Sequence, residues 1–146
     1  MLSVQHEDFN VAEEYNALKC AAENPGGIVM FVGLVRDMPG GLVQMTLEHY
    51  PEMTQKSLAQ IIAEANTRWL LQSVRVVHRV GELMPSDQIV FVGVASLHRS
   101  EAFMAAEFIM DYLKTSAPFW KKEKQKNSEA WVQAREADEL ARARWS

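Results

Sequence analysis

Two lysines on either side of a proline are the residues of this sequence best suited to do chemistry. In the stretch DYLKTSAPFWKKE (111–123), Lys114 closes an amphipathic helical pattern and Lys121 follows soon after the proline. Pro118 disfavours helical geometry for the residue before it and has no amide donor, so we expect a corner between two structured pieces. A corner with a cation on each side could hold an anion, although lysines on a solvated surface are common.

A second set of candidate anion ligands lies where two apolar strands are expected to end. SLHRSEAF (96–103) leads from a strand into a helix, where free amides and the positive end of the helix dipole gather. His98 and Arg99 add side-chain donors there, unless His98 only caps the helix and Arg99 pairs with a carboxylate. Arg36 ends the other strand and, considered in isolation, is expected to be a residue at the rim of the sheet. Phe31 on the same strand is expected in the core.

The elements that must position these residues follow from the hydrophobic periodicity. The pattern predicts helices over 10–24, 51–70 and 100–114, and strands over 28–36, 42–50, 73–83, 88–97 and about 131–134. A glycine-rich turn between the first two strands suggests that they form a hairpin. Strand pairs that alternate with helices predict one α+β domain spanning 1–146. We expect a mostly antiparallel sheet, helices packed on one face of it, and a small C-terminal β appendage.

Composition narrows the function classes. The chain has 146 residues, 48% hydrophobic and 23% charged, which is typical of a soluble globular domain. No apolar run approaches the roughly 20 residues that span a bilayer, and no leader is evident, so we expect a cytoplasmic protein without a membrane partner. The single Cys20 agrees with a reducing compartment. A net charge of −4 argues against a nucleic-acid partner, yet residues 111–126 carry five lysines and two acids.

Metal and nucleotide motifs are not found in the sequence. The four histidines lack close pairing, and a lone cysteine provides no thiolate cluster. The glycines of GLVRDMPGG lie between two expected strands and do not open a helix, unlike those of phosphate-binding loops.

Six segments resemble the large, catalytic subunit of molybdopterin synthase. They are FVGLVRD, TLEHYPEMTQKSL, VHRVGEL, IVFVGVASLHRSEAF, FIMDYLKTSAPFWKKE and WVQAREAD, in this order, and the resemblance covers about residues 3–145. The pairing of HRS with YLKT and PFWKKE is its most specific part. The resemblance implies an α/β-hammerhead-like fold and a sulfurtransferase of molybdenum cofactor biosynthesis, which converts cyclic pyranopterin monophosphate into the dithiolene molybdopterin.

The same resemblance implies a partner and an assembly. Sulfur would arrive as a thiocarboxylate on the C-terminal Gly-Gly tail of a small ubiquitin-like subunit, and a homodimer would carry one small subunit at each end, as a heterotetramer. No cofactor is implied. A partner that carries the sulfur also removes the need for a reactive cysteine, and Cys20 is expected to pack within the first helix.

Residue roles come from matching motif positions. Lys114 and Lys121 correspond to the catalytic lysines of the family. The substrate-binding positions comprise four basic residues of an anion pocket, Arg36, His98, Arg99 and Arg135, and two apolar residues of its wall, Phe31 and Met110. For the two apolar residues, core packing is a competing explanation. Because the family forms a homodimer, His98 and Arg99 could reach the pocket of the opposite protomer.

Two functions from other classes remain open on the residues alone. A non-catalytic regulatory domain could bind an anionic metabolite in the same basic corner, and it would not need Lys114 specifically. Binding of RNA through Trp120 and the lysine cluster is weaker, because a net basic surface is expected for that role.

Overall fold

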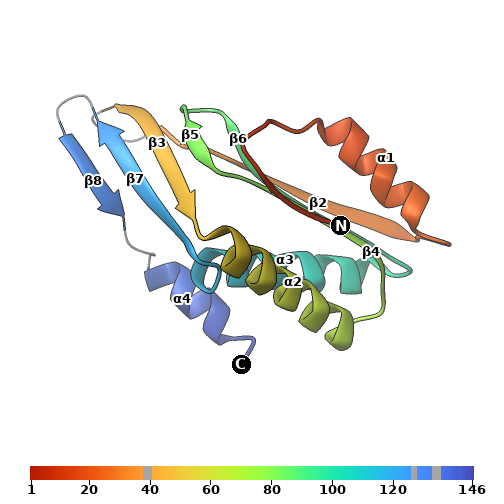
Figure 1. Cartoon of the computed structure of the whole chain (residues 1–146). Helices are drawn as coiled ribbons and strands as arrows, with labels where there is room; N and C mark the ends of the chain where they lie inside the picture. Colours follow the sequence, from red (N-terminus) through yellow and green to blue (C-terminus); the bar gives the residue numbers. More distant parts are fainter. Residues whose placement is uncertain (38–40, 126–127, 133–135) are drawn as a thin grey trace.

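The computed structural model describes residues 1–37, 41–125, 128–132 and 136–146. Its elements, in chain order, are β1 (Leu2–Gln5), α1 (Val11–Ala21), β2 (Gly27–Leu34), β3 (Leu42–His49), α2 (Pro51–Arg68), β4 (Leu71–Arg79), β5 (Gly81–Leu83), β6 (Gln88–Ser96), α3 (Arg99–Thr115), β7 (Phe119–Gln125), β8 (Ser128–Val132) and α4 (Glu136–Ala143) (Figure 1).

The strands form two four-stranded sheets. The first has the order β1-β4-β6-β2, in which only β1 and β4 are parallel, and the second has the order β5-β3-β7-β8 with antiparallel pairs. Figure 1 shows the second sheet at one end of the first, with α2 and α3 below them. The expected α+β class and the mostly antiparallel pairing are confirmed.

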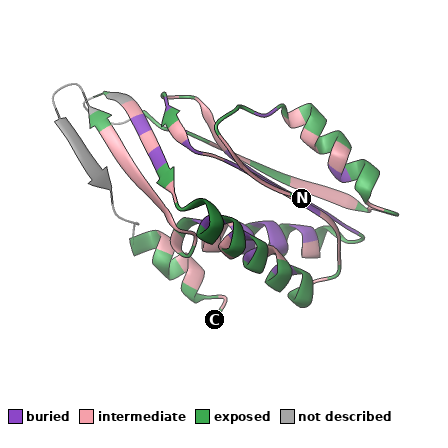
Figure 2. Cartoon of the chain, in the orientation of Figure 1, coloured by how far each residue is buried: buried purple, intermediate pink, exposed green. Residues whose placement is uncertain are grey.

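Helices cover both faces of the first sheet, whereas the sequence pattern predicted one covered face. α2 and α3 pack on the side of Val76 and Val92, and α1 packs its Leu18 against Val77 on the other side. Strands buried on both faces carry continuous rather than alternating apolar runs. IVFVGVA of β6 is such a run, so the second covered face was visible in the sequence. Buried residues accordingly concentrate on the central strands and on α3 (Figure 2).

The expected hairpin between residues 28–36 and 42–50 is wrong. β2 pairs along its whole length with β6, from Gly27 opposite Ser96 to Leu34 opposite Gln88. β3 pairs with β5 and β7 in the other sheet. The two strands are therefore neighbours in sequence only, because pairing with the buried β6 satisfies the backbone of β2 instead.

The chain after Pro118 holds more structure than its polar composition suggested. A polar stretch was expected before a short strand near 131–134, but β7 begins directly after the proline and pairs with β3 on one side and β8 on the other. α4 was expected to be a charged tail, and β1 was not expected. Among the helices that the structure describes, none is long and apolar enough to cross a membrane.

Candidate functional site

The corner at Pro118 joins the end of α3 to the start of β7. Lys114 lies in the last turn of α3, and the amide of Ser116 closes the helix by donating to the Tyr112 carbonyl at 2.8 Å. The Pro118 carbonyl accepts a bond of 3.3 Å from Oγ1 of Thr54, a buried residue in the first turns of α2. A helix from elsewhere in the chain thus anchors the corner.

α4 also reaches this corner. Nη1 of Arg142 donates to Oγ of Ser116 at 3.4 Å. Further along, Nε1 of Trp145 donates to Oδ2 of Asp111 at 2.6 Å, and Nη2 of Arg144 lies 3.1 Å from the same oxygen. The C-terminal segment is therefore fastened to the last turns of α3, which carry Lys114.

The two lysines that the sequence singled out lie on the two sides of this corner. Lys114 is exposed, and among the residues that the structure describes it has no ion-pair partner. Lys121 is half-buried and lies opposite Leu47 of β3. Phe119 and Lys121 point to the same face of β7, because side chains alternate along a strand.

Two histidines flank Phe119 on that face. The ring of His78, at the end of β4, stacks on Phe119 with a centroid distance of 4.0 Å and an interplanar angle of 19°. His49 of β3, directly opposite Phe119 in the ladder, lies 6.4 Å from it at 30°. From the sequence, these histidines were candidates only for metal ligands. The position of each histidine near the end of a strand was a signal in the sequence that they could lie at the same edge. Only the pairing of the strands showed that both rings lie beside Phe119.

His78 is an uncharged histidine beside a cation. Only 8% of its surface is exposed, and this burial lowers its pKa to about 4. The hydrogen bond with the Arg79 carbonyl acts in the opposite direction, while Coulombic interactions with Lys114 and His49 lower the pKa further. The charge of Lys114 therefore acts on His78, whose ring stacks on Phe119 at the corner.

His98 and Arg99 lie at the opposite end of α3. His98 occupies the N-cap position without a side-chain cap bond, and Arg99 is the first residue of the helix. Both are exposed, and within the described part of the chain Arg99 has no carboxylate partner. Lys114 lies fifteen positions after Arg99, or about 22 Å along the helix. One protomer therefore does not bring them to the same side of the corner.

Arg36 is exposed just beyond β2. The preceding residue, Val35, is bonded to the 85–87 turn, since its amide donates to the Asp87 carbonyl at 2.9 Å. Val35 also packs with Met45 of β3 and Leu83 of β5, so Arg36 follows directly on the junction between the two sheets. Phe31 was expected in the core, but it is 44% exposed on the edge strand β2, so this expectation is wrong.

Comparison with known proteins decides the family. A family model described as MoaE protein matches residues 4–116. The molybdopterin synthase catalytic subunit of Vibrio cholerae is 55% identical over 146 residues, covering 99% of this chain and 97% of that protein. This chain belongs to the MoaE protein family.

Solved structures agree with this assignment. The molybdopterin biosynthesis MoaE protein from Burkholderia ambifaria has a TM-score of 0.87 and 49% identity, over 99% of this chain and 97% of that one. A chain of the protein–protein complex of subunits 1 and 2 of the molybdopterin-converting factor from Helicobacter pylori has a TM-score of 0.76 over 92% of this chain and 91% of that one. At 19% identity, this second likeness concerns the fold alone.

The structure bears on the remaining residues that were singled out in the sequence of this member of the MoaE family. Met110 is half-buried on α3 and packs against the main core, in line with the competing packing explanation. Arg135 lies outside the described residues. Cys20 is exposed on α1, so its expected packing role is wrong. Among the described residues, no group of three or more His, Cys, Asp or Glu side chains could hold a metal ion.

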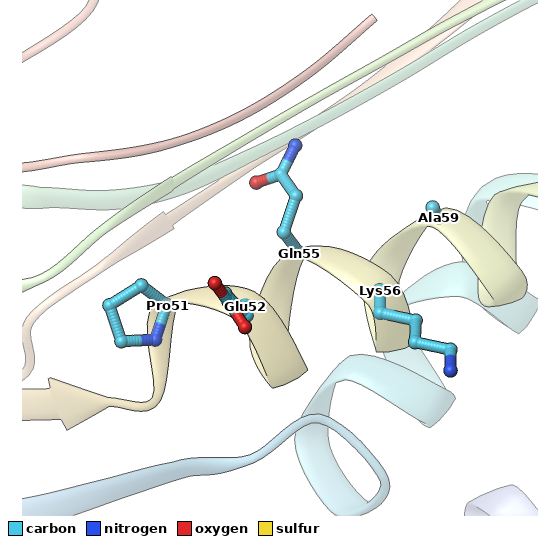
Figure 3. A pocket seen from close by; sticks show the side chains of 5 residues that line it. All are labelled: Pro51, Glu52, Gln55, Lys56 and Ala59. Carbon is cyan, nitrogen blue, oxygen red and sulfur yellow. The ribbon is translucent and has the colours of Figure 1, made fainter.

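A hollow on the outer side of α2 is separate from this group of residues. Its lining consists of exposed residues in the first turns of the helix: Pro51, Glu52, Gln55, Lys56 and Ala59 (Figure 3). It contains one acid and one base and none of the site residues expected for the MoaE family. Thr54, between these residues in sequence, instead points toward the corner.

Proposed function

We propose that this chain is the catalytic subunit of a molybdopterin synthase. It transfers sulfur to cyclic pyranopterin monophosphate and so forms the dithiolene of molybdopterin in molybdenum cofactor biosynthesis. The observation that carries this function is the 55% identity to a molybdopterin synthase catalytic subunit over 99% of the chain. The 49% identity to a molybdopterin biosynthesis protein with nearly the same fold supports it.

The sulfur donor in this proposal is a small ubiquitin-like subunit with a C-terminal Gly-Gly thiocarboxylate. Each thiocarboxylate carries one sulfur atom, so two are consumed for one dithiolene. The complex of two subunits of the Helicobacter pylori molybdopterin-converting factor, whose fold this chain shares, supports a two-protein enzyme. We assign the chain to a homodimer within a heterotetramer. We also assign it to the cytoplasm, because a lone cysteine fits a reducing compartment.

Lys114 and Lys121 are the proposed catalytic residues. Lys114 acts as general acid/base or as electrostatic stabiliser while sulfur adds to the substrate, and Lys121 stabilises negative charge that develops on oxygen. Their positions on the two sides of an anchored corner support this assignment. An ammonium group at Lys114 that no carboxylate of the described chain neutralises is available to an anion.

The proposed substrate-binding residues come from two protomers. One protomer supplies Arg36, Arg135, Phe31 and Met110 around the lysines, and the other supplies His98 and Arg99. The length of α3 supports this division, because a pair of residues about 22 Å from Lys114 cannot share a small ligand with it. Mixed dimers of Arg99→Ala and Lys114→Ala protomers test it. Such dimers contain one intact shared site and should recover about half the activity, whereas no recovery would contradict sharing.

The function is tested by reconstitution. Purified protein is mixed with a thiocarboxylated small subunit and the cyclic precursor, and dithiolene product is measured. Lys114→Ala should abolish product formation, while Lys19→Ala, an exposed lysine on the far helix α1, should leave it unchanged. No product from the unmodified protein would contradict the proposal. A regulatory domain that only binds an anionic metabolite would form no product and would lose affinity only modestly with Lys114→Ala.

The proton-transfer role of Lys114 has a test of its own. Lys114→Arg keeps the positive charge but holds its proton far above neutral pH. If Lys114 moves a proton, the pH–rate profile of the Arg variant should lose one limb. A profile that matches the unmodified enzyme would leave Lys114 with an electrostatic role only.

A further inference from the structure

We propose that His78 is a positioning residue of this enzyme: it holds the start of β7 against the end of β4 and thereby fixes where Lys121 lies relative to Lys114. The inference rests on the function and the lysine roles proposed above. His78 belongs to the first sheet and Lys121 to the second, so the residue acts across the junction of the two sheets.

The contact that transmits this effect is a parallel ring stack. The rings of His78 and Phe119 lie 4.0 Å apart and are inclined by only 19°, the closest aromatic pair among the described residues. Phe119 is the first residue of β7, and Lys121 lies two residues further on the same face. A shift of the Phe119 ring therefore shifts the backbone that carries Lys121.

A second contact fixes the plane of the His78 ring. Nδ1 lies 2.8 Å from the carbonyl oxygen of Arg79. Because a carbonyl oxygen only accepts hydrogen bonds, Nδ1 carries the proton in this pair. A hydrogen bond in the plane of the His78 imidazole fixes the orientation of this ring, and Phe119 packs across its face. Because the His78 ring is fixed, the Phe119 ring stacked on it has little freedom to move.

The neutral form of His78 is part of the same arrangement. Lys114 from α3 and His49 from β3 are the charged and titratable groups that act on it, and both disfavour a proton on His78. An uncharged ring at this place adds no repulsion toward the Lys114 ammonium group. The end of α3, with Lys114, and the start of β7, with Phe119, are therefore joined at the corner without a further positive charge on His78.

The experiment compares three variants in the reconstituted enzyme with its small subunit. His78→Ala removes the stack, and His78→Phe keeps an aromatic ring on Phe119. Phe9→Ala removes a buried ring from the other face of the sheet, where Phe9 packs edge-on against Phe91, and serves as the matched control. All are assayed at a temperature at which circular dichroism shows each to be folded.

We expect His78→Ala to lower kcat by about 10- to 100-fold, because displacement of a reacting group by about 1 Å has effects of that size. KM for the precursor should change much less. His78→Phe should restore kcat to within a few-fold of the unmodified enzyme, and Phe9→Ala should keep kcat despite its loss of stability. Unchanged kcat in His78→Ala, or equal losses in His78→Ala and Phe9→Ala, would overturn the inference.

A spectroscopic measurement separates this inference from the proposed function. The ring protons of Phe119 should shift in the NMR spectrum of His78→Ala, and so should the side-chain signals of Lys121, while those of Lys19 on α1 stay in place. If the unmodified protein forms no dithiolene, the proposed function fails, and the positioning role is then decided by these signals. Unmoved Lys121 signals would overturn it in either case.

Discussion

Replacement of Thr54 by valine should loosen the corner that carries the two lysines. The hydroxyl of this fully buried residue donates to the Pro118 carbonyl, and valine fills the same volume without a donor. The bond of 3.3 Å is long for a hydroxyl donor, so we expect a loss at the low end of the usual range, about 1 to 2 kcal/mol. For 146 residues this corresponds to a fall in Tm of about 3 to 6 °C.

The same substitution elsewhere on α2 provides the control. Thr67 is exposed and its hydroxyl bonds the Glu64 carbonyl of its own helix, so Thr67→Val should change the free energy of unfolding by less than about 0.5 kcal/mol. Thermal denaturation of both variants gives the stabilities, and dithiolene formation gives kcat, which should fall several-fold only for Thr54→Val. Equal Tm and kcat in the two variants would refute the idea that Thr54 anchors the corner.

Two further predictions concern the C-terminal segment and pH. Trp145→Phe removes the 2.6 Å hydrogen bond to Asp111 but keeps a ring against Trp69 and Phe108. Calorimetry should therefore record a decrease of about 1 to 2 kcal/mol in the free energy of unfolding. An unchanged Tm would show that the hydrogen bond contributes nothing. His78 has a pKa of about 4 in the folded chain against 6.5 ordinarily, so the unfolded chain binds more protons between these values and stability falls as pH falls. When the pH is lowered from 7.5 to 4.5, the free energy of unfolding measured with urea should fall by about 2 to 3 kcal/mol more for the unmodified protein than for His78→Phe. Equal falls in the two proteins would contradict a neutral His78.

The sequence predicted local elements where local signals were strong. The capping pair Asn10 and Glu13 marked the start of α1, and the Asn10 side chain does accept from the Glu13 amide. Pro51 opened α2 as expected, and Pro118 ended α3 within three residues. β7 was missed because FWKKEKQ carries charges on both faces of the strand, which conceals the alternation that marks a half-buried strand.

Strand partners could not be read in the same way. The Gly-rich turn after β2 resembled a hairpin, but pairing is chosen among all strands by total burial, and β6 offers an apolar surface on both faces. Only the three-dimensional arrangement showed that β2 and β3 belong to different sheets.

For the site, the sequence alone singled out Lys114 and Lys121 only as candidate anion ligands, because cations beside a proline form a local pattern that needs no long-range contact; their proposed catalytic role comes from the family resemblance. The motifs that contain them also sufficed to suggest the family. The tertiary structure decided which groups meet at Phe119, between these lysines in sequence: His78 and His49, each remote in sequence from Phe119, reach it through stacking and strand pairing. The separation of His98 and Arg99 from Lys114, by contrast, already follows from the helix predicted over 100–114, because an α-helix of 17 residues holds its two ends apart.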